Sequence, residues 1–282
     1  MRSTGADQDI TRQSNSFRPF GPPPDPKSYA FRSVYCGVIS EVSLATTMED
    51  ILYDEMINEL HHETVMKNAA LAQCIYIFVE GESEETTFQM LLEDQLCGLN
   101  FEENGVVVAN YNGIGNLQHA VRLLRKTLSH DRPIVVTYDD DLEGKAKLKY
   151  LDDPLIIPFK IPQTPVVEFG DGSFGGSFEE AFSPDCFLRS CFEGQVLPSG
   201  FNGSQADFSA SFDQTKPWIP QLAKYVGSNG CHPASINKVI LAENMAHNCD
   251  PVPESFIKLA ETVLDLRKRN PVKHPDDVEL PI

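Results

Sequence analysis

The apolar and polar positions of the chain predict a long helical segment followed by a buried strand. Between Thr47 and Leu71, apolar residues recur at helical spacing, which predicts one long or two short amphipathic helices. Residues 72–79, AQCIYIFV, form an apolar run rich in residues favoured in strands, and Glu80 and Gly81 end it. Such a run predicts a strand buried on both faces, as in a parallel sheet.

Strands and helices then alternate through the middle of the chain. The pattern predicts further strands at 106–109, 133–138 and 155–159, and helices at 83–97 and 117–128. A strand–helix–strand–helix–strand order is typical of a parallel sheet with helices on its faces. We therefore expect an α/β fold whose parallel sheet is flanked by helices.

The two ends of the chain have different patterns. Residues 1–33 are polar and proline-rich, which predicts a disordered tail. Beyond about residue 165, apolar residues recur in helix-like pieces, so we expect a mainly helical C-terminal extension. The expected pieces lie at 178–192, 215–227, 233–247 and 253–269, with a mobile Gly-, Ser- and Asn-rich stretch at 193–214. The predicted organisation is a tail (1–33), a helical segment (34–70), the sheet domain (71–165), the helical extension (166–270) and a second tail (271–282).

Composition narrows the classes of function. No run approaches the ~20 apolar residues of a membrane span, so no membrane partner is expected. The first residues lack the apolar core of a secretory signal, and we expect a cytoplasmic location. The seven cysteines stand singly, which describes neither a disulfide framework nor a zinc site.

The formal net charge of −18 opposes nucleic-acid binding, because proteins that hold nucleic acid usually present a basic surface. Three short clusters of basic residues also occur, and each is expected to be a solvated helix face rather than a phosphate track: Arg122, Arg125 and Lys126; Lys145, Lys147 and Lys149; Arg267, Lys268 and Arg269. A carboxylate site becomes attractive to phosphate once a cation is bound, since the ion then dominates the local field. The acidic balance is therefore compatible with a metal-dependent site.

Acidic residues stand where two of the predicted strands end. Glu80 follows the first strand, with Glu84 one helical turn later, and Asp139 and Asp141 follow the third. Because the carboxyl ends of parallel strands meet at one edge, we expect these four carboxylates to lie together. Crowded carboxylates favour a cation, and all-oxygen ligands select Mg²⁺ or Mn²⁺. Two such ions can clamp a phosphodiester, so the sequence predicts a metal-dependent phosphodiesterase that acts on nucleic acid.

Several segments together resemble the Toprim domain of the OLD (overcoming lysogenization defect) family of nucleases. IYIFVEGESEE at 75–85 followed by VVTYDDDLEG at 135–144 is similar to the strand-end glutamate and the later DxD motif of Toprim domains. Four further segments resemble OLD-like motifs: NYNGIGN at 110–116, SFEEAFSPDCFLRS at 177–190, SINKVILAENMA at 235–246 and PVPESF at 251–256. The resemblance spans roughly 72–265 and implies a Toprim-like fold.

The resemblance also implies a role for each matched residue and two bound Mg²⁺ or Mn²⁺ ions. The residues implied in metal binding are Glu80, Glu84, Asp139, Asp141 and Glu179 (or Glu180). Those implied in catalysis are Glu80, Asp139, Asp141 and Lys238, with Lys216 as the alternative to Lys238. Phosphate binding is implied for the backbone at Gly113 and Gly115. Simpler interpretations stay open. The glutamates can cap helices, the aspartates can form a solvated turn, and the lysine can lie on the surface.

Two functions stay open at this stage. One is an OLD-like endonuclease that nicks or cuts nucleic acid, with DNA preferred over RNA. The other is a non-catalytic module that binds metal or nucleotide at the acidic edge. Most OLD nucleases carry an ABC ATPase domain, but this sequence has no GxxxxGK[ST] phosphate loop. Three explanations stay open: the nuclease works alone, another polypeptide supplies the ATPase, as in two-gene anti-phage defence systems, or the chain is a fragment of a larger gene. The helical residues 48–70 would dock a partner, form a homo-oligomer or cover the sheet.

Overall fold

The computed structural model describes residues 48–93, 97–148 and 153–273. Contacts divide the chain into two units, residues 1–50 and 51–282, and the elements described below belong to the second unit apart from the first residues of helix α1 (Met48–Ala72). The tail predicted at 1–33 lies outside the described residues, as do residues 274–282 of the tail predicted at 271–282.

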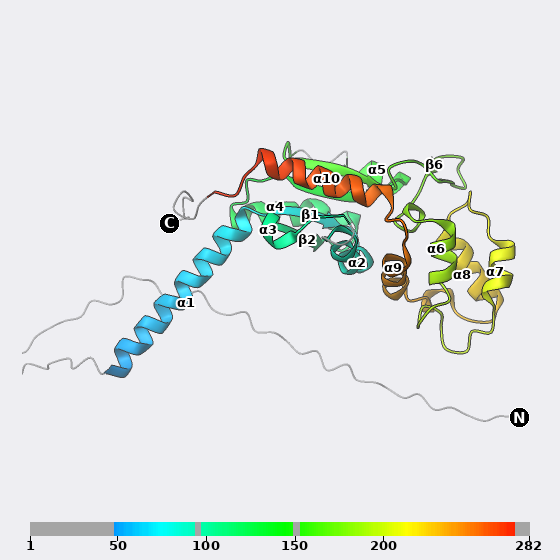
Figure 1. The fold of residues 1–282 in the computed structure, drawn as a ribbon, viewed down its shortest axis with the longest axis horizontal. Coiled ribbons are helices and arrows are strands. Elements are labelled where there is room, and N and C mark those ends of the chain that lie inside the picture. The colour runs from blue at the N-terminus through cyan, green and yellow to red at the C-terminus, as the bar shows by residue number, and fades with distance from the viewer. Residues whose placement is uncertain (1–47, 94–96, 149–152, 274–282) are drawn as a thin grey trace, which may run out of the picture. The chain divides into compact units, whose positions relative to one another are not determined.

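A four-stranded parallel sheet forms the centre of the second unit (Figure 1). Its strands are β1 (Ile75–Val79), β2 (Val106–Asn110), β3 (Ile134–Asp139) and β4 (Ile156–Ile161). They lie in the order β2-β1-β3-β4, and Tyr76 of β1 is in register with Val107 on one side and Ile134 on the other. The predicted α/β fold with a parallel sheet is confirmed, although β1 begins at Ile75 because α1 continues to Ala72.

The two faces of the sheet contribute to separate hydrophobic cores. Side chains alternate along β1, so Ile77 and Val79 enter one core while Tyr76 and Phe78 enter the other. The first core continues into α2 (Glu82–Leu92), α9 (Lys238–Asn248) and α10 (Glu254–Arg269), and the second into α4 (Leu117–Leu128). Every residue of β1 is buried, and each large apolar side chain buried in this way stabilises the fold by about 1.5–3 kcal/mol.

Shorter elements complete the described structure, and they confirm a mainly helical C-terminal extension. They are α3 (Phe101–Asn104), η1 (Ile114–Asn116), α5 (Leu142–Leu148), β5 (Val167–Glu168), β6 (Phe174–Gly175), η2 (Glu179–Ala181), α6 (Pro184–Ser190), α7 (Gln205–Ser211), α8 (Trp218–Ser228) and η3 (Pro233–Ser235). The stretch 193–214, predicted to be mobile, contains α7. There Ser204 caps the helix by accepting from the Asp207 amide, and Phe208 is buried.

Helix α1 leaves part of its length uncovered. Residues 55–64 are exposed, including Met56, Ile57 and Leu60, so this part of the helix does not cover the sheet. None of the helices in the described ranges is both long enough and apolar enough to cross a bilayer.

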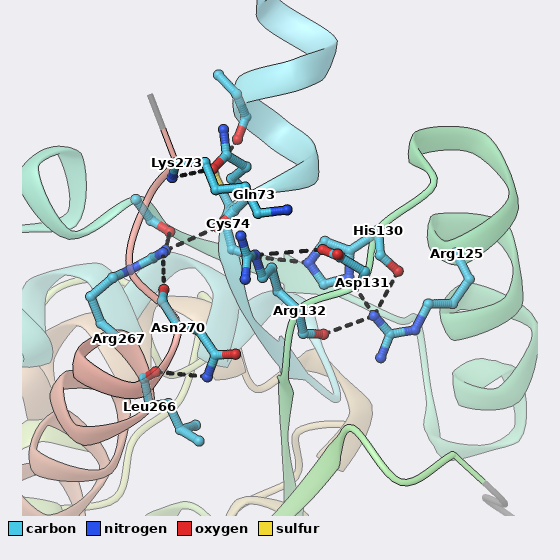
Figure 2. Close-up of polar contacts among 12 residues, drawn as sticks. Gln73, Cys74, Arg125, His130, Asp131, Arg132, Leu266, Arg267, Asn270 and Lys273 are labelled. Atoms are coloured by element: carbon cyan, nitrogen blue, oxygen red, sulfur yellow. Dashed lines mark hydrogen bonds and ion pairs between the residues drawn. The ribbon is translucent and has the colours of Figure 1, made fainter. Parts of the chain in front are cut away.

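The amino edge of the sheet, where the parallel strands begin, is held by arginine side chains (Figure 2). Arg267 of α10 donates from Nη2 to the carbonyls of Gln73 (3.1 Å) and Gly105 (2.8 Å), just before β1 and β2. Arg125 of α4 donates from Nη1 to the carbonyls of His130 (2.9 Å) and Arg132 (2.8 Å), just before β3. Helices on both faces are thereby tied to the starts of three strands.

Candidate metal centre at the carboxyl edge

The carboxyl edge of the sheet, where the parallel strands end, includes a reversal in strand order. The chain passes from β1 outward to β2 and then returns across β1 to β3, so β1 and β3 flank the switch point. Ligands of open α/β sheets bind outside the carboxyl ends of the strands at such a point. Glu80 directly follows β1, and Asp139 is the last residue of β3. The fold thus delivers one acid from each of these two strands.

Hydrogen bonds fix the ends of β1 and β3. The Thr137 hydroxyl donates to the Phe78 carbonyl over 3.0 Å, and the Tyr111 hydroxyl donates to the Thr137 carbonyl over 3.1 Å. The amide of Gly113 donates to the Glu80 carbonyl over 2.8 Å. Sequence reasoning missed Thr137 and Tyr111, although a threonine inside an otherwise apolar strand marks a position where a polar side chain needs a partner.

A small pocket opens at this point. Three of the predicted acids, Glu80, Glu84 and Asp139, line it together with Phe88, Thr137, Tyr138, Ile161 and Phe178. The aromatic and aliphatic walls exclude water from one side of the acids. Electrostatic interactions between charges in such a place are stronger than in bulk water.

Five carboxylates influence one another here. Burial raises the pKa of Asp139 well above its usual range, and the charges of Glu179, Glu84, Glu80 and Asp141 raise it further. Burial also raises the pKa of Glu84 to about 7; backbone hydrogen bonds oppose the rise, and Glu179 and Glu80 add to it. We call these five residues the acid cluster. The structure therefore brings together the glutamates after β1, the aspartates after β3 and a glutamate of η2.

Three members of the acid cluster accept hydrogen bonds from backbone amides. The pairs are Glu84 Oε2 with Gly81 (3.0 Å), Asp139 Oδ1 with Phe178 (3.0 Å) and Asp141 Oδ1 with Gly144 (2.7 Å). In these orientations, no three acidic, histidine or cysteine side chains of the described residues already form a metal-binding group. The donors still fit a hard cation in their chemistry, since they are all carboxylate oxygens and their mutual repulsion is relieved by positive charge. Binding would require the side chains to turn toward the ion.

Gly144 allows helix α5 to begin directly against the DxD motif. A Cβ atom at this position would lie 2.6 Å from the Asp139 carbonyl oxygen, which is too close for any other residue. The glycine in DDDLEG therefore permits close approach to the Asp139 carbonyl, and its amide holds the Asp141 carboxylate.

Glu179 and Glu180 have different surroundings. Glu180 is 3% exposed and accepts hydrogen bonds from the amides of Trp218 (2.7 Å) and Ser177 (2.6 Å) and from the Ser177 hydroxyl. Both of its carboxylate oxygens are occupied, which ties η2 to the start of α8. Glu179 instead raises the pKa of Asp139 and Glu84, and burial raises its own pKa. The geometry favours Glu179 as the member of the acid cluster.

The two candidate lysines are also distinguished by their neighbours. Lys238 is the first residue of α9, whose N-cap is Asn237, and its ammonium group opposes the rise in the pKa of Glu179. Lys216 Nζ lies 3.0 Å from Glu168 Oε2 in an exposed ion pair. Lys238 is therefore the lysine with electrostatic influence on the acid cluster.

The glycine turn after β2 serves the backbone beside Glu80. Asn112 and Gly113 have φ values of 55° and 89°, in the left-handed region that favours glycine. The Gly113 amide is bonded to the Glu80 carbonyl, so it holds the turn against β1. The Gly113 amide is therefore already engaged, and phosphate binding at Gly113 and Gly115 stays a prediction.

One comparison with known families bears on this site. Residues 71–141 match the family model described as "Overcoming lysogenization defect protein-like, TOPRIM domain". The match covers 71 of the 282 residues, and it confirms the predicted OLD-like Toprim domain over β1, β2, β3 and the DxD motif. Glu179 and Lys238 lie beyond the matched residues. No curated protein and no solved structure matches the chain.

Proposed function

We propose that the OLD-like Toprim domain makes this chain an endonuclease that nicks or cuts DNA with Mg²⁺ or Mn²⁺ bound at the acid cluster. The observation that carries the proposal is the repulsion within that cluster. Residues from β1, α2, β3 and η2 share one edge, where the pKa values of Asp139, Glu84 and Glu179 are raised. A fold retains such repulsion at positions where a ligand compensates for it.

Each residue of the site has a proposed role that follows from its position. The ligands of two cations would be Glu80, Glu84, Asp139, Asp141 and Glu179. Bound cations would polarise the phosphodiester and acidify the attacking water. Glu80, at the end of β1, would accept the proton of that water. The ammonium of Lys238 would stabilise the charge that develops on the phosphoryl oxygens.

Apolar neighbours would strengthen these interactions. Phe88, Ile161 and Phe178 line one part of the pocket surface with apolar atoms, and all three are buried. Water cannot screen the charges from that side, so each carboxylate acts on its ligand more strongly than it would on an open surface.

The second candidate is a non-catalytic module that binds metal or nucleotide at the same edge. Two observations favour it: the net charge of −18 and the hydrogen bonds that draw three carboxylates toward backbone amides. In this case the cluster would bind cations, and no phosphodiester bond would break.

The setting of the activity is part of the proposal. In the cytoplasm, a separate ABC-type ATPase subunit would supply any ATP-dependent control, and anti-phage defence is the role that suits such a pair. Co-purification of the chain with such a subunit would support this arrangement.

Incubation of supercoiled plasmid with the purified chain and Mg²⁺ or Mn²⁺ tests the leading candidate. Nicked or linear product should form, and Asp139→Asn should reduce the rate by about 10²-fold or more, the cost of removing one group that stabilises a transition state. Glu85→Gln is the matched control, because Glu85 is an exposed acid in the first turn of the same helix as Glu84.

The outcomes separate the two candidates. Cation binding without cleavage supports the non-catalytic module. Cleavage by Asp139→Asn at the rate of the unaltered chain overturns the assignment of the active site.

A further inference from the structure

The middle aspartate of the DxD motif lies apart from the acid cluster. Side chains alternate at the end of β3, so Asp140 points to the opposite face from Asp139. Asp140 is 1% exposed, and its backbone is held by the Ile161 carbonyl (3.2 Å) and the Gly176 amide (3.3 Å). Gly175 permits this close packing, since a Cβ there would lie 1.7 Å from the Asp140 carbonyl oxygen.

Two lysines from different elements hold the Asp140 carboxylate. Lys145 Nζ of α5 lies 2.7 Å from Oδ1, and Lys160 Nζ of β4 lies 3.3 Å from Oδ2. The lysine side chains are 44% and 35% exposed, whereas the Asp140 side chain is 2% exposed. An ammonium group has three N–H donors, so each lysine keeps donors for a group that approaches from solvent.

The charges of this triad do not cancel. One lysine would neutralise Asp140, and the second leaves a net charge of +1 in a chain whose total is −18. Both lysines contact Asp140, which lies at the carboxyl edge and is adjacent in sequence to Asp139 and Asp141. A single phosphodiester carries the complementary charge of −1.

We propose that Lys145 and Lys160, positioned by the buried Asp140, bind one backbone phosphate of the DNA strand that the acid cluster cleaves. The triad would supply a positively charged contact for DNA on a chain whose net negative charge otherwise repels it. The inference rests on the proposed function for its substrate, but it concerns binding rather than hydrolysis. Sequence reasoning treated Lys145 as part of a solvated helix face, and the ion pair with a buried acid is what distinguishes it.

Salt-dependent DNA binding tests the proposal. A labelled DNA duplex is titrated with the full chain in Ca²⁺ across a range of NaCl concentrations, and a gel checks that the duplex stays intact. The variant Asp140→Asn/Lys145→Gln/Lys160→Gln removes the whole triad without leaving a buried charge. Its slope of log affinity against log salt should fall in magnitude by about 1, and its affinity at moderate salt by roughly fivefold.

A control with at least as large a charge change guards against a bulk electrostatic effect. Lys126→Gln/Lys268→Gln removes two exposed lysines from the last turns of α4 and α10, near the amino edge. The slope for this control should equal that of the unaltered chain. An equal loss in control and triad variants would assign the effect to net charge and overturn the proposal.

A second variant serves if the triple substitution prevents folding. Lys160→Gln removes the excess charge while Lys145 still neutralises Asp140, and it should also lower the slope by about 1. Thermal unfolding of each variant checks that it is folded. An unchanged slope in a folded variant, or a failure of the unaltered chain to bind the duplex, overturns the phosphate site.

Failure of the inference and failure of the proposed function give different results. If plasmid is cut and Asp139→Asn is inactive while the triad variants keep the original slope, the proposed nuclease activity is supported and the phosphate site is overturned. If plasmid is never cut but the slope decreases in the triad variants as expected, the phosphate site is supported and the proposed nuclease activity is overturned.

Discussion

The charged side chains at the two edges of the sheet have different partners. At the amino edge, Arg267 and Arg125 donate to backbone carbonyls (Figure 2). Arg125 also pairs with Asp153 at 3.0 Å. At the carboxyl edge, the acid cluster gathers carboxylates whose charges raise the pKa values of Asp139 and Glu84. At one edge charged donors satisfy backbone carbonyls, and at the other carboxylates crowd together.

The difference indicates what each edge is for. A buried arginine with carbonyl partners stabilises the fold, because its donors satisfy acceptors that would otherwise be buried alone. Crowded carboxylates cost stability in the absence of a cation, so their presence favours a ligand-binding role. Loss of a charged group should therefore harm folding at the amino edge and harm function at the carboxyl edge.

Arg267→Gln should give the largest change in stability. The carbonyls of Gln73 and Gly105 would lose their charged donor, and we expect the free energy of unfolding to fall by about 3 kcal/mol. Urea denaturation measures the change. The exposed Arg269 offers a matched control, and Arg269→Gln should change the free energy by no more than about 0.5 kcal/mol. Equal effects of the two substitutions would contradict a structural role for Arg267.

Substitutions of the two neighbouring glutamates of η2 should have separate effects, one on DNA cleavage and the other on stability. Glu179→Gln should lower plasmid cleavage by about 10²-fold while leaving the thermal midpoint unchanged or higher, because it relieves repulsion. Glu180→Gln should lower the free energy of unfolding by about 1–2 kcal/mol, since a charged acceptor of the Trp218 and Ser177 amides is lost. The reverse pattern would exchange the roles of the two residues.

The carboxyl edge should make the cation-free chain less stable as pH rises. The pKa of Glu84 is about 7 in the fold against 4.5 for the free side chain, so the folded state binds more protons between these values. Its stabilisation is present below about pH 4.5 and is lost as pH rises through 7, by about 2 kcal/mol after allowance for solvent screening. Chemical denaturation with EDTA measures the loss, and Glu84→Gln should flatten it. A steeper loss in the variant would contradict the prediction.

The amino edge should respond to pH in the opposite direction. Burial lowers the pKa of His130 below 6.5, and the nearby Arg125 and Arg132 lower it further, although Asp131 and the Cys74 carbonyl oppose them. The unfolded chain therefore binds more protons at this residue, and stability is lost as pH falls below 6.5. His130→Gln should remove this acid-side loss in the same denaturation series. If the free energy of unfolding falls below pH 6.5 as much in the variant as in the unaltered chain, the loss belongs to other groups.

Much of the sheet could be predicted from the sequence, because buried parallel strands are continuous apolar runs. The runs before Glu80 and before Asp139 gave the ends of β1 and β3 to within one residue, and the parallel arrangement implied that their acids share an edge. The short elements could not be predicted. The hairpin β5–β6 has strands of two residues, and α7 depends on a serine cap and on one buried phenylalanine.

Residue-level features of the site depended on contacts that no local pattern contains. The pairing of Lys160 with Asp140 requires β4 to lie beside β3 in a register that places Lys160 opposite Tyr138. The choice of Glu179 over Glu180 depends on the amides of Ser177 and Trp218, the second of which is distant in sequence. Sequence analysis therefore left that choice open, together with the choice between Lys238 and Lys216.

The most direct test of the acid cluster is an anomalous difference map from crystals of the chain that contain Mn²⁺. We predict peaks beside Glu80, Glu84 and Asp139 and their loss in Asp139→Asn. Manganese bound elsewhere with none at the carboxyl edge, or identical peaks in the variant, would contradict the account.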